Sequence, residues 1–141
     1  MNTAFEILGR WHPAMVHFPV ALILAAGAAE ILYAVRREQR FGEAARFMIA
    51  AAAWIGVPAA AAGFAAAAGE MFTEELAATL AIHRIAGVVT PVLAFVAHGL
   101  CEGTRRSGQV WEQMLYRGFL LLAVAIVLVA AYHGGKLGHG L

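Results

Sequence analysis

Four long apolar stretches dominate the chain and dictate what it can fold into. They cover about residues 13–35, 44–69, 80–101 and 114–133, and short charged or polar segments separate them. Each holds about 20 residues or more, enough for a helix to cross a hydrocarbon core about 30 Å thick. Helix is required because lipid offers the backbone no hydrogen-bond partner, and the stretches are too long for barrel strands. The sequence therefore predicts four transmembrane helices.

The composition supports lipid as the solvent of a single transmembrane domain, residues 1–141. Hydrophobic residues make up 62% of the chain, its mean hydropathy is +0.73, and charged residues make up only 13%. A soluble domain of this size cannot bury so much apolar surface. The net charge of +1 lacks the dense basic face that nucleic-acid binding requires. The single cysteine, Cys101, excludes an internal disulfide and the CxxCH attachment site of c-type haem.

The short connections and the positions of the cations predict the topology. Consecutive helices should be antiparallel neighbours in an all-α, up-down four-helix bundle. Seven arginines flank the first and third connections, and three cations lie at the opposite face. By the positive-inside rule, the bundle is a multi-pass protein of the bacterial inner membrane with both termini on the periplasmic side. The seven are Arg36, Arg37, Arg40, Arg46, Arg105, Arg106 and Arg117, and the three are Arg10, Arg84 and Lys136.

Five of the six histidines fall at the outward face of this predicted bundle. His12 and His17 begin the first stretch, His83 begins the third, and His133 and His139 follow the fourth. Imidazole is the commonest side-chain ligand of metals and a frequent axial ligand of haem iron. Ionisable side chains within a membrane are costly and are usually functional. The pattern therefore predicts a metal or haem site near the outer leaflet.

His17 and His83 are the predicted ligands of that site, for a metal or for haem iron. They lie on different helices at matched depth, which is what the two axial imidazoles of haem b require. His12 and His133 are the alternative ligands. The cations of the same face could neutralise haem propionates, and they are Arg10, Arg84 and Lys136.

The sixth histidine, His98, is predicted to lie apart from the others. It follows His83 by 15 residues on the same helix, which is about 22 Å at the α-helical rise. Only one haem is therefore expected. Glu30 of the first stretch lies at a similar depth, and we expect a Glu30–His98 pair to shield both groups from lipid.

Small residues are expected to set helix packing and helix length. Ala59, Gly63 and Ala67 repeat at four-residue spacing, and such a ridge lets transmembrane backbones approach closely. A flat macrocycle also needs small neighbours, so the ridge is compatible with haem. The two glycines after His133 are expected to end the fourth helix and to leave His139 in a solvated tail.

Three segments resemble a bacterial family of four-helix membrane proteins of unknown function. They are HPAMVHFPVAL in the first stretch, IHRIAG in the third, and the ending HGGKLGHG. The HPxxVHFP element is the most specific of them, and the resemblance covers nearly the whole chain. Relatives in this family are joined to Rieske-type or c-type cytochrome domains, so the resemblance implies membrane electron transfer. Because this sequence has no such domain, we expect any redox partner to be a separate chain.

The preferred hypothesis is a small b-type cytochrome, or the haem-carrying subunit of a redox complex, with one haem b. It would pass electrons near the periplasmic face, between a membrane donor such as quinol and a separate redox protein. The protein would fix the ligand geometry and tune the potential of the haem. This role is that of an electron-transfer subunit more than of a stand-alone enzyme.

Two other hypotheses remain open. One is a porphyrin-free copper or zinc ion held by the outward histidines, with Met15 as a soft ligand for Cu(I). The other is a structural membrane subunit without a cofactor, whose histidines bond lipid headgroups or neighbouring proteins. A homodimer is compatible with all three, since Trp54 and Trp111 need lipid or a partner to cover them. The histidines meant in the metal hypothesis are His12, His17, His83 and His133.

Overall fold

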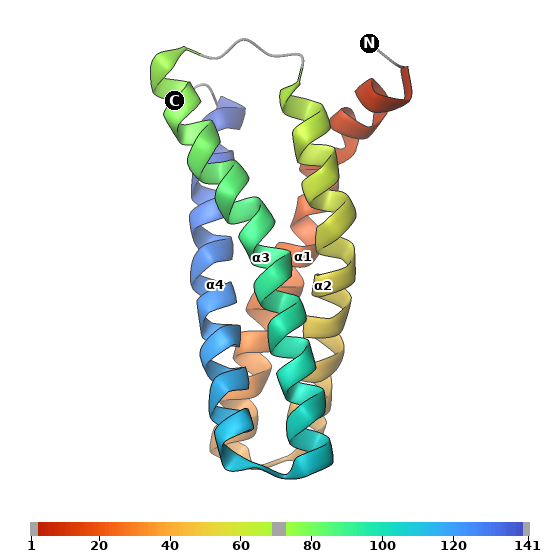
Figure 1. The fold of residues 1–141 in the computed structure, drawn as a ribbon, viewed down its shortest axis with the longest axis vertical. Coiled ribbons are helices and arrows are strands. Elements are labelled where there is room, and N and C mark those ends of the chain that lie inside the picture. Colours follow the sequence, from red (N-terminus) through yellow and green to blue (C-terminus); the bar gives the residue numbers. More distant parts are fainter. Residues whose placement is uncertain (1–2, 69–72, 140–141) are drawn as a thin grey trace.

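The protein is an all-helical bundle. The computed structural model describes residues 3–68 and 73–139, without the side chains of residues 3–5, 75 and 139, and these residues form no strand. The four helices are α1 (Thr3–Arg36), α2 (Gln39–Ala67), α3 (Glu74–Ser107) and α4 (Val110–His139) (Figure 1).

Each helix contains a segment that is long and apolar enough to cross a membrane. These segments are Glu6–Arg36, Gln39–Ala67, Leu76–Ser107 and Val110–Gly138. The shortest has 29 residues and is about 44 Å long, which exceeds the hydrocarbon thickness of about 30 Å. The helices therefore extend into the headgroup layers, beyond the apolar stretches. The predicted fold class is confirmed, and the orientation across the membrane stays a prediction.

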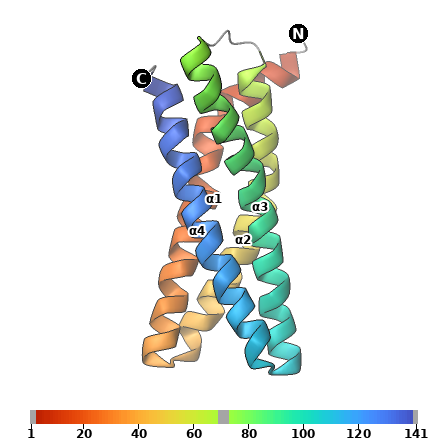
Figure 2. The same cartoon turned by 60° about the vertical axis from the view of Figure 1, so that its left-hand side comes forward.

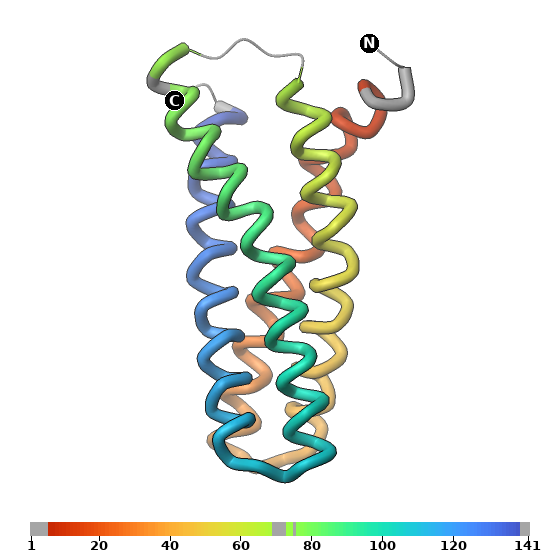
Figure 3. The backbone as a smooth tube through the Cα atoms, viewed as in Figure 1, coloured from red at the N-terminus to blue at the C-terminus, as the bar shows by residue number. Residues whose placement is uncertain are grey.

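The helices run up and down as two hairpins, α1–α2 and α3–α4, packed side by side (Figures 1 and 2). The turns within both hairpins lie at one end of the bundle, which we call the loop end. The start of α1, the end of α2, the start of α3 and the end of α4 lie at the other, which we call the terminal end (Figure 3). The first turns of α1 lean away from the bundle in both views. Pro13 follows them, and proline removes the N–H that would bond the carbonyl four residues earlier.

The end of α4 differs from the sequence prediction. The helix does not stop at His133 but continues through Gly134 and Gly135 to His139. Gly134 packs against the ring of His83, where a Cβ would lie 2.9 Å from Cε1. The glycine therefore serves a close contact with α3 and does not break the helix.

Both hairpin turns begin with a residue in the left-handed conformation. Arg37 has φ 59°, and its N–H donates to the carbonyl of Tyr33 at 2.9 Å. Gly108 has φ 67°, and its N–H donates to the carbonyl of Thr104 at 2.8 Å. Each bond satisfies a carbonyl that the helix end would leave without a partner. Glycine adopts this conformation without strain, whereas arginine does not.

Alanine fills most of the core, which explains how the four helices approach one another. Fully buried Ile23, Ile49 and Leu120 are the largest side chains among many buried alanines. Gly56 of α2 meets Pro91 of α3 so closely that a Cβ would lie 2.9 Å from the proline Cβ. Small residues thus let the helix backbones approach closely, as they do in other transmembrane bundles. The large apolar side chains instead face outward, as expected for contact with lipid, and Trp54 and Trp111 are among them.

The strain at Arg37 leads to a prediction. Replacing Arg37 by glycine should stabilise the protein by about 1 kcal/mol, because the αL conformation then costs nothing. The melting temperature in detergent should rise by a few degrees. Arg36→Gly is the matched control one residue earlier, at the last position of α1, and it should not raise the melting temperature, because Arg36 is helical and glycine is a poorer helix former. A lower melting temperature for the Arg37 variant would contradict the assigned turn.

Candidate functional site

Two histidines from different hairpins face each other near the terminal end of the bundle. His12 of α1 and His83 of α3 are both half-buried, and their ring centroids lie 6.2 Å apart. The ring planes are inclined at 77°. The structure therefore pairs two imidazoles between the hairpins, on the face where the sequence predicts a site.

A backbone carbonyl fixes each of these rings. The Nδ1–H of His12 donates to the carbonyl of Ala59 on α2 at 3.0 Å. The Nδ1–H of His83 donates to the carbonyl of Ala130 on α4 at 2.8 Å. Because a carbonyl only accepts, Nδ1 carries the hydrogen in both rings, and a neutral ring keeps a lone pair on Nε2. Metal-binding histidines commonly have this arrangement, with one nitrogen anchored and the other available.

Two glycines make room for the rings. A Cβ on Gly63 of α2 would lie 2.8 Å from Cε1 of His12, and one on Gly134 of α4 would lie 2.9 Å from Cε1 of His83. Real Cβ atoms do not approach other atoms so closely, so each imidazole lies directly on the backbone of the neighbouring helix. We call these contacts the glycine cradles. They fix where the two rings lie within the membrane.

The two halves of this site are equivalent positions of an internal repeat. His83, Ala130 and Gly134 follow His12, Ala59 and Gly63, respectively, by 71 residues, and each half makes the same contacts. The site therefore lies between two similarly built halves of the chain.

The same offset extends through both hairpins. The left-handed residues Arg37 and Gly108 are 71 residues apart. So are the fully buried Ile49 and Leu120. The chain is thus built from two similar hairpins, related by an approximate two-fold rotation about the long axis of the bundle. Further buried pairs at this offset are Ile23 with Ala94, Ala26 with Ala97, Ala45 with Tyr116, and Ala52 with Ala123.

Sequence reasoning missed this repeat because few residues are identical between the halves. The pattern Ala-Ala-x-x-Gly begins at Ala59 and, 71 residues later, at Ala130, although it also begins at Ala52 and at Ala65. The occurrences at Ala59 and Ala130 supply the carbonyls and the glycines that hold the two histidines. The 71-residue offset that these two occurrences share with His12 and His83 is the signal that would have pointed to the pair.

The partner of His83 is therefore His12, and not His17 as the sequence analysis expected. His17 is exposed, and its Nδ1 bonds the carbonyl of Pro13 on its own helix. Five residues along an α-helix correspond to a rotation of about 140°, so His12 and His17 point to different sides of α1. Matching depth in the sequence could not reveal this difference in rotation.

The other predicted residues of this face are placed as follows. Arg84 lies against the ring of Phe64 at 5.7 Å, and its Nε is buried without a hydrogen-bond partner. Arg10 is exposed. The Nδ1 of His133 is buried without a partner, and its ring packs edge-on against Tyr132 at 5.2 Å. Lys136 lies over the ring of Tyr132, with its Nζ 5.0 Å from the ring centroid. The side chain of His139 lies outside the described residues.

A small cavity connects the two rings with Arg84. Its volume is about 40 Å³, and its wall includes both imidazoles and Gly63. Within the part of the chain that the structure describes, no three His, Cys, Asp or Glu side chains group closely enough to hold a metal ion. The structure thus brings together two of the four histidines named in the copper or zinc hypothesis, His12 and His83, and that hypothesis stays a prediction. The site offers two imidazoles.

Glu30 and His98 do not form the expected pair. The Glu30 carboxylate accepts hydrogen bonds from Tyr116 Oη at 3.2 Å and from Arg117 Nε at 2.8 Å, both on α4. The Nδ1 of His98 is buried without a partner. The sequence analysis used Arg117 only to predict the orientation. Because its charge is fixed, Arg117 is a stronger partner than a histidine for a carboxylate in a low-dielectric environment.

Taken together, the spanning helices and the paired imidazoles define a polytopic helical membrane protein made of two hairpins. Residues 10–140 match the family of predicted membrane proteins designated DUF2231. The chain belongs to this family, which agrees with the resemblance in the sequence to a family of membrane proteins. No curated protein and no solved structure matches the chain.

The glycine cradles lead to a second prediction. Gly63→Ala and Gly134→Ala should each lower stability by about 1–3 kcal/mol, because the new methyl group overlaps an imidazole ring. Thermal unfolding in detergent measures the loss. Gly99→Ala is the control, since a Cβ at Gly99 meets nothing within 4 Å and alanine favours helix. Equal melting temperatures for all three variants would contradict the cradles.

Proposed function

We propose that the protein is a haem-carrying electron-transfer subunit of the bacterial inner membrane, with His12 and His83 as the axial ligands of one haem b. One observation carries the proposal. The two imidazoles come from different hairpins, each has its Nδ1 anchored on a backbone carbonyl, and each keeps Nε2 for a metal. Axial ligation by such rings is one of the recurring ways in which proteins hold haem iron.

The separation of the rings agrees with one metal between them. A metal–imidazole bond is about 2.0–2.1 Å long, and the ring centroid lies roughly 1 Å beyond the nitrogen, so two rings on opposite sides of one ion have centroids about 6 Å apart. The distance between His12 and His83 is 6.2 Å. This distance would suit one metal ion between the rings, whereas the porphyrin around that ion would require the hairpins to separate.

A site with only two protein ligands suits haem better than it suits a bare ion that needs four ligands. The porphyrin supplies the other four nitrogens, so no third side chain is required. The buried Nε of Arg84, which has no partner, is a suitable donor for a propionate. The glycine cradles keep the ligand rings close to the neighbouring helices. The bound haem would supply a one-electron redox centre within the bundle.

The chain itself would control that centre through the surroundings of the two rings. The carbonyls of Ala59 and Ala130 hold each imidazole in one tautomer and make Nε2 a better donor. Burial among apolar residues sets the local dielectric and hence the potential. A separate redox protein or a membrane quinol would exchange electrons at the terminal end, where the site lies close to the membrane surface.

Copper is the second candidate, and the size of the cavity favours it. A volume of about 40 Å³ holds one ion or one water more readily than a macrocycle, which would require the hairpins to separate. Imidazole suits copper, and Cu(I) accepts two nitrogen ligands in a linear arrangement. Zinc is less suitable, because structural zinc sites are almost always four-coordinate.

A visible spectrum of the purified protein tests the proposal. After expression with added haem, the reduced-minus-oxidised spectrum should show Soret and α bands, with iron at one atom per chain. His12→Ala and His83→Ala should each remove the bands, because each deletes one axial ligand. His17→Ala is the matched control on α1 and should leave both the spectrum and the iron content unchanged.

Three outcomes would contradict haem ligation by this pair. Copper at one atom per chain, with iron absent, would favour the second candidate. A protein without metal, whose assembly is indifferent to both substitutions, would support a structural subunit. Loss of the bands in the His17 variant but not in the His12 variant would restore the pair expected from sequence alone.

A further inference from the structure

A second, larger cavity lies at the loop end, far from the paired histidines. Its volume is about 210 Å³, and all four helices contribute to its wall. Unlike the rest of the bundle interior, it is lined with charged and hydrogen-bonding side chains. Those used below are Glu30, Arg46, Thr104, Arg105 and Tyr116.

The depth of this cavity matches the boundary between hydrocarbon and headgroups. Glu30 lies six residues before the end of α1, and Tyr116 lies six residues after the start of α4. At the α-helical rise this is about 9 Å. The headgroup layer occupies about 5–7 Å on each side of the hydrocarbon core. The cavity therefore opens where lipid phosphates lie and reaches just below them.

The carboxylate of Glu30, which lines the cavity, already has hydrogen-bond partners. Both oxygens of Glu30 accept hydrogen bonds, one from Tyr116 Oη and the other from Arg117 Nε. The carboxylate is buried, and the guanidinium of Arg117 neutralises it at 2.8 Å. This carboxylate therefore does not call for a cation in the cavity.

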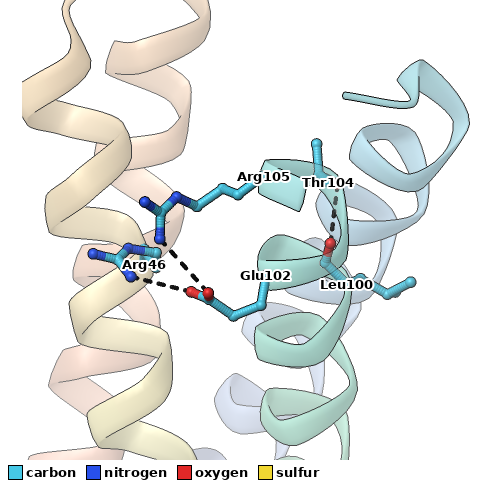
Figure 4. Close-up of polar contacts among 5 residues, drawn as sticks. All are labelled: Arg46, Leu100, Glu102, Thr104 and Arg105. Atoms are coloured by element: carbon cyan, nitrogen blue, oxygen red, sulfur yellow. Dashed lines mark hydrogen bonds and ion pairs between the residues drawn. The ribbon is translucent and has the colours of Figure 1, made fainter. Parts of the chain in front are cut away.

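Between the hairpins, in contrast, two arginines share one acid. Arg46 of α2 and Arg105 of α3 share the single carboxylate of Glu102, at 3.2 and 3.6 Å (Figure 4). Two guanidinium groups on one carboxylate leave a net charge of about +1. Thr104, which also lines the cavity, is uncharged, and its hydroxyl donates to the carbonyl of Leu100 at 2.9 Å. Glu43 also lines the cavity, so the lining as a whole carries two acids and two arginines, but Glu43 is exposed to solvent and has no part in this cluster.

Two arginines also have buried donors that lack an acceptor. These are Nε of Arg46, which lines the cavity, and Nη2 of Arg117, whose partner Glu30 lines it. The two arginines are 71 residues apart, so they are equivalent positions of the repeat, one in each hairpin. A buried donor without a partner is costly. An acceptor-rich anion in the cavity would satisfy the donor of Arg46, which lines it, and would balance the second guanidinium of the Arg46–Glu102–Arg105 cluster.

We propose that this cavity binds a phosphate group, with Arg46 and Arg105 as its principal contacts. Arginine recognises phosphate through several charge-assisted hydrogen bonds at once. Basic pockets between transmembrane helices bind anionic lipid headgroups, and the loop end is the end that the arginine count assigns to the cytoplasm. The phosphate belongs to an anionic lipid or is free in solution. The proposal does not depend on the histidine site.

Lipid selectivity of the full chain tests the first source. The protein is reconstituted into nanodiscs with equal amounts of phosphatidylglycerol and phosphatidylcholine, and bound lipids are counted by native mass spectrometry. Bound phosphatidylglycerol should exceed phosphatidylcholine about tenfold, as expected for charge-assisted hydrogen bonds to one site. For the second source, inorganic phosphate is titrated into delipidated protein in neutral detergent, with chloride at equal ionic strength as the reference.

Three variants separate the site from general surface charge. Arg46→Gln should reduce binding about tenfold, because it removes the charge and the donor together. Arg46→Lys keeps the charge and the pairing with Glu102 but loses the guanidinium fork, so it should bind at an intermediate level. Arg40→Gln is the control, because Arg40 pairs with Glu38 at 2.6 Å and is 71% exposed. It should bind as the unmodified protein does.

Each outcome either identifies the source of the phosphate or overturns the proposal. Preferential retention of phosphatidylglycerol without a response to phosphate assigns the site to lipid, and the reverse assigns it to a free phosphate. Absence of both effects in the unmodified protein overturns the proposal. Equal losses in the Arg40 and Arg46 variants also overturn it, because they would show attraction to the whole basic end and not to the cavity. If Arg46→Gln does not fold, the Lys variant and the selectivity of the unmodified chain still decide.

Discussion

The absence of water from the hydrocarbon core is the constraint on which this structure depends. It forces the backbone into continuous helices, and it requires each polar side chain within the spans to find a partner in the protein. The bundle meets this requirement with few polar residues. His12 and His83 bond carbonyls of neighbouring helices, and Glu30 is held by Tyr116 and Arg117. Among the described residues, two of the arginines with a buried nitrogen that has no partner, Arg46 and Arg84, line the two cavities.

The repeat of two hairpins explains why polar groups gather at both ends of the long axis. Equivalent residues of the two halves come together wherever they point toward the axis that relates the hairpins. At the terminal end this rule brings the imidazoles of His12 and His83 together. Toward the loop end it gives each hairpin an equivalent arginine, Arg46 or Arg117, bound to an acid of the other hairpin. A repeated hairpin thus produces two distinct polar centres in an otherwise apolar interior.

Both centres join the hairpins, and this gives ligand binding a structural consequence. A metal held by one histidine from each half would link α1 to α3. A phosphate held by Arg46 and Arg105 would link α2 to α3. Any ligand that binds the folded bundle and not the separated hairpins stabilises it in proportion to its concentration above the dissociation constant. The alanine-rich core supplies close packing but few large buried side chains, so such links matter for the stability of this bundle.

Hydrophobicity along the sequence was sufficient to determine four spanning helices, their antiparallel order and the face at which most histidines lie, because each of these depends only on position along the chain. The tertiary structure decided which side chains meet. His17 lies five residues from His12 at a suitable depth but points to another side of α1, and Glu30 meets Arg117 in preference to His98. Gly134 continues α4 because the ring of His83 occupies the space beside it. Rotation about each helix axis is set by contacts between helices, and those contacts join residues that are distant in the sequence.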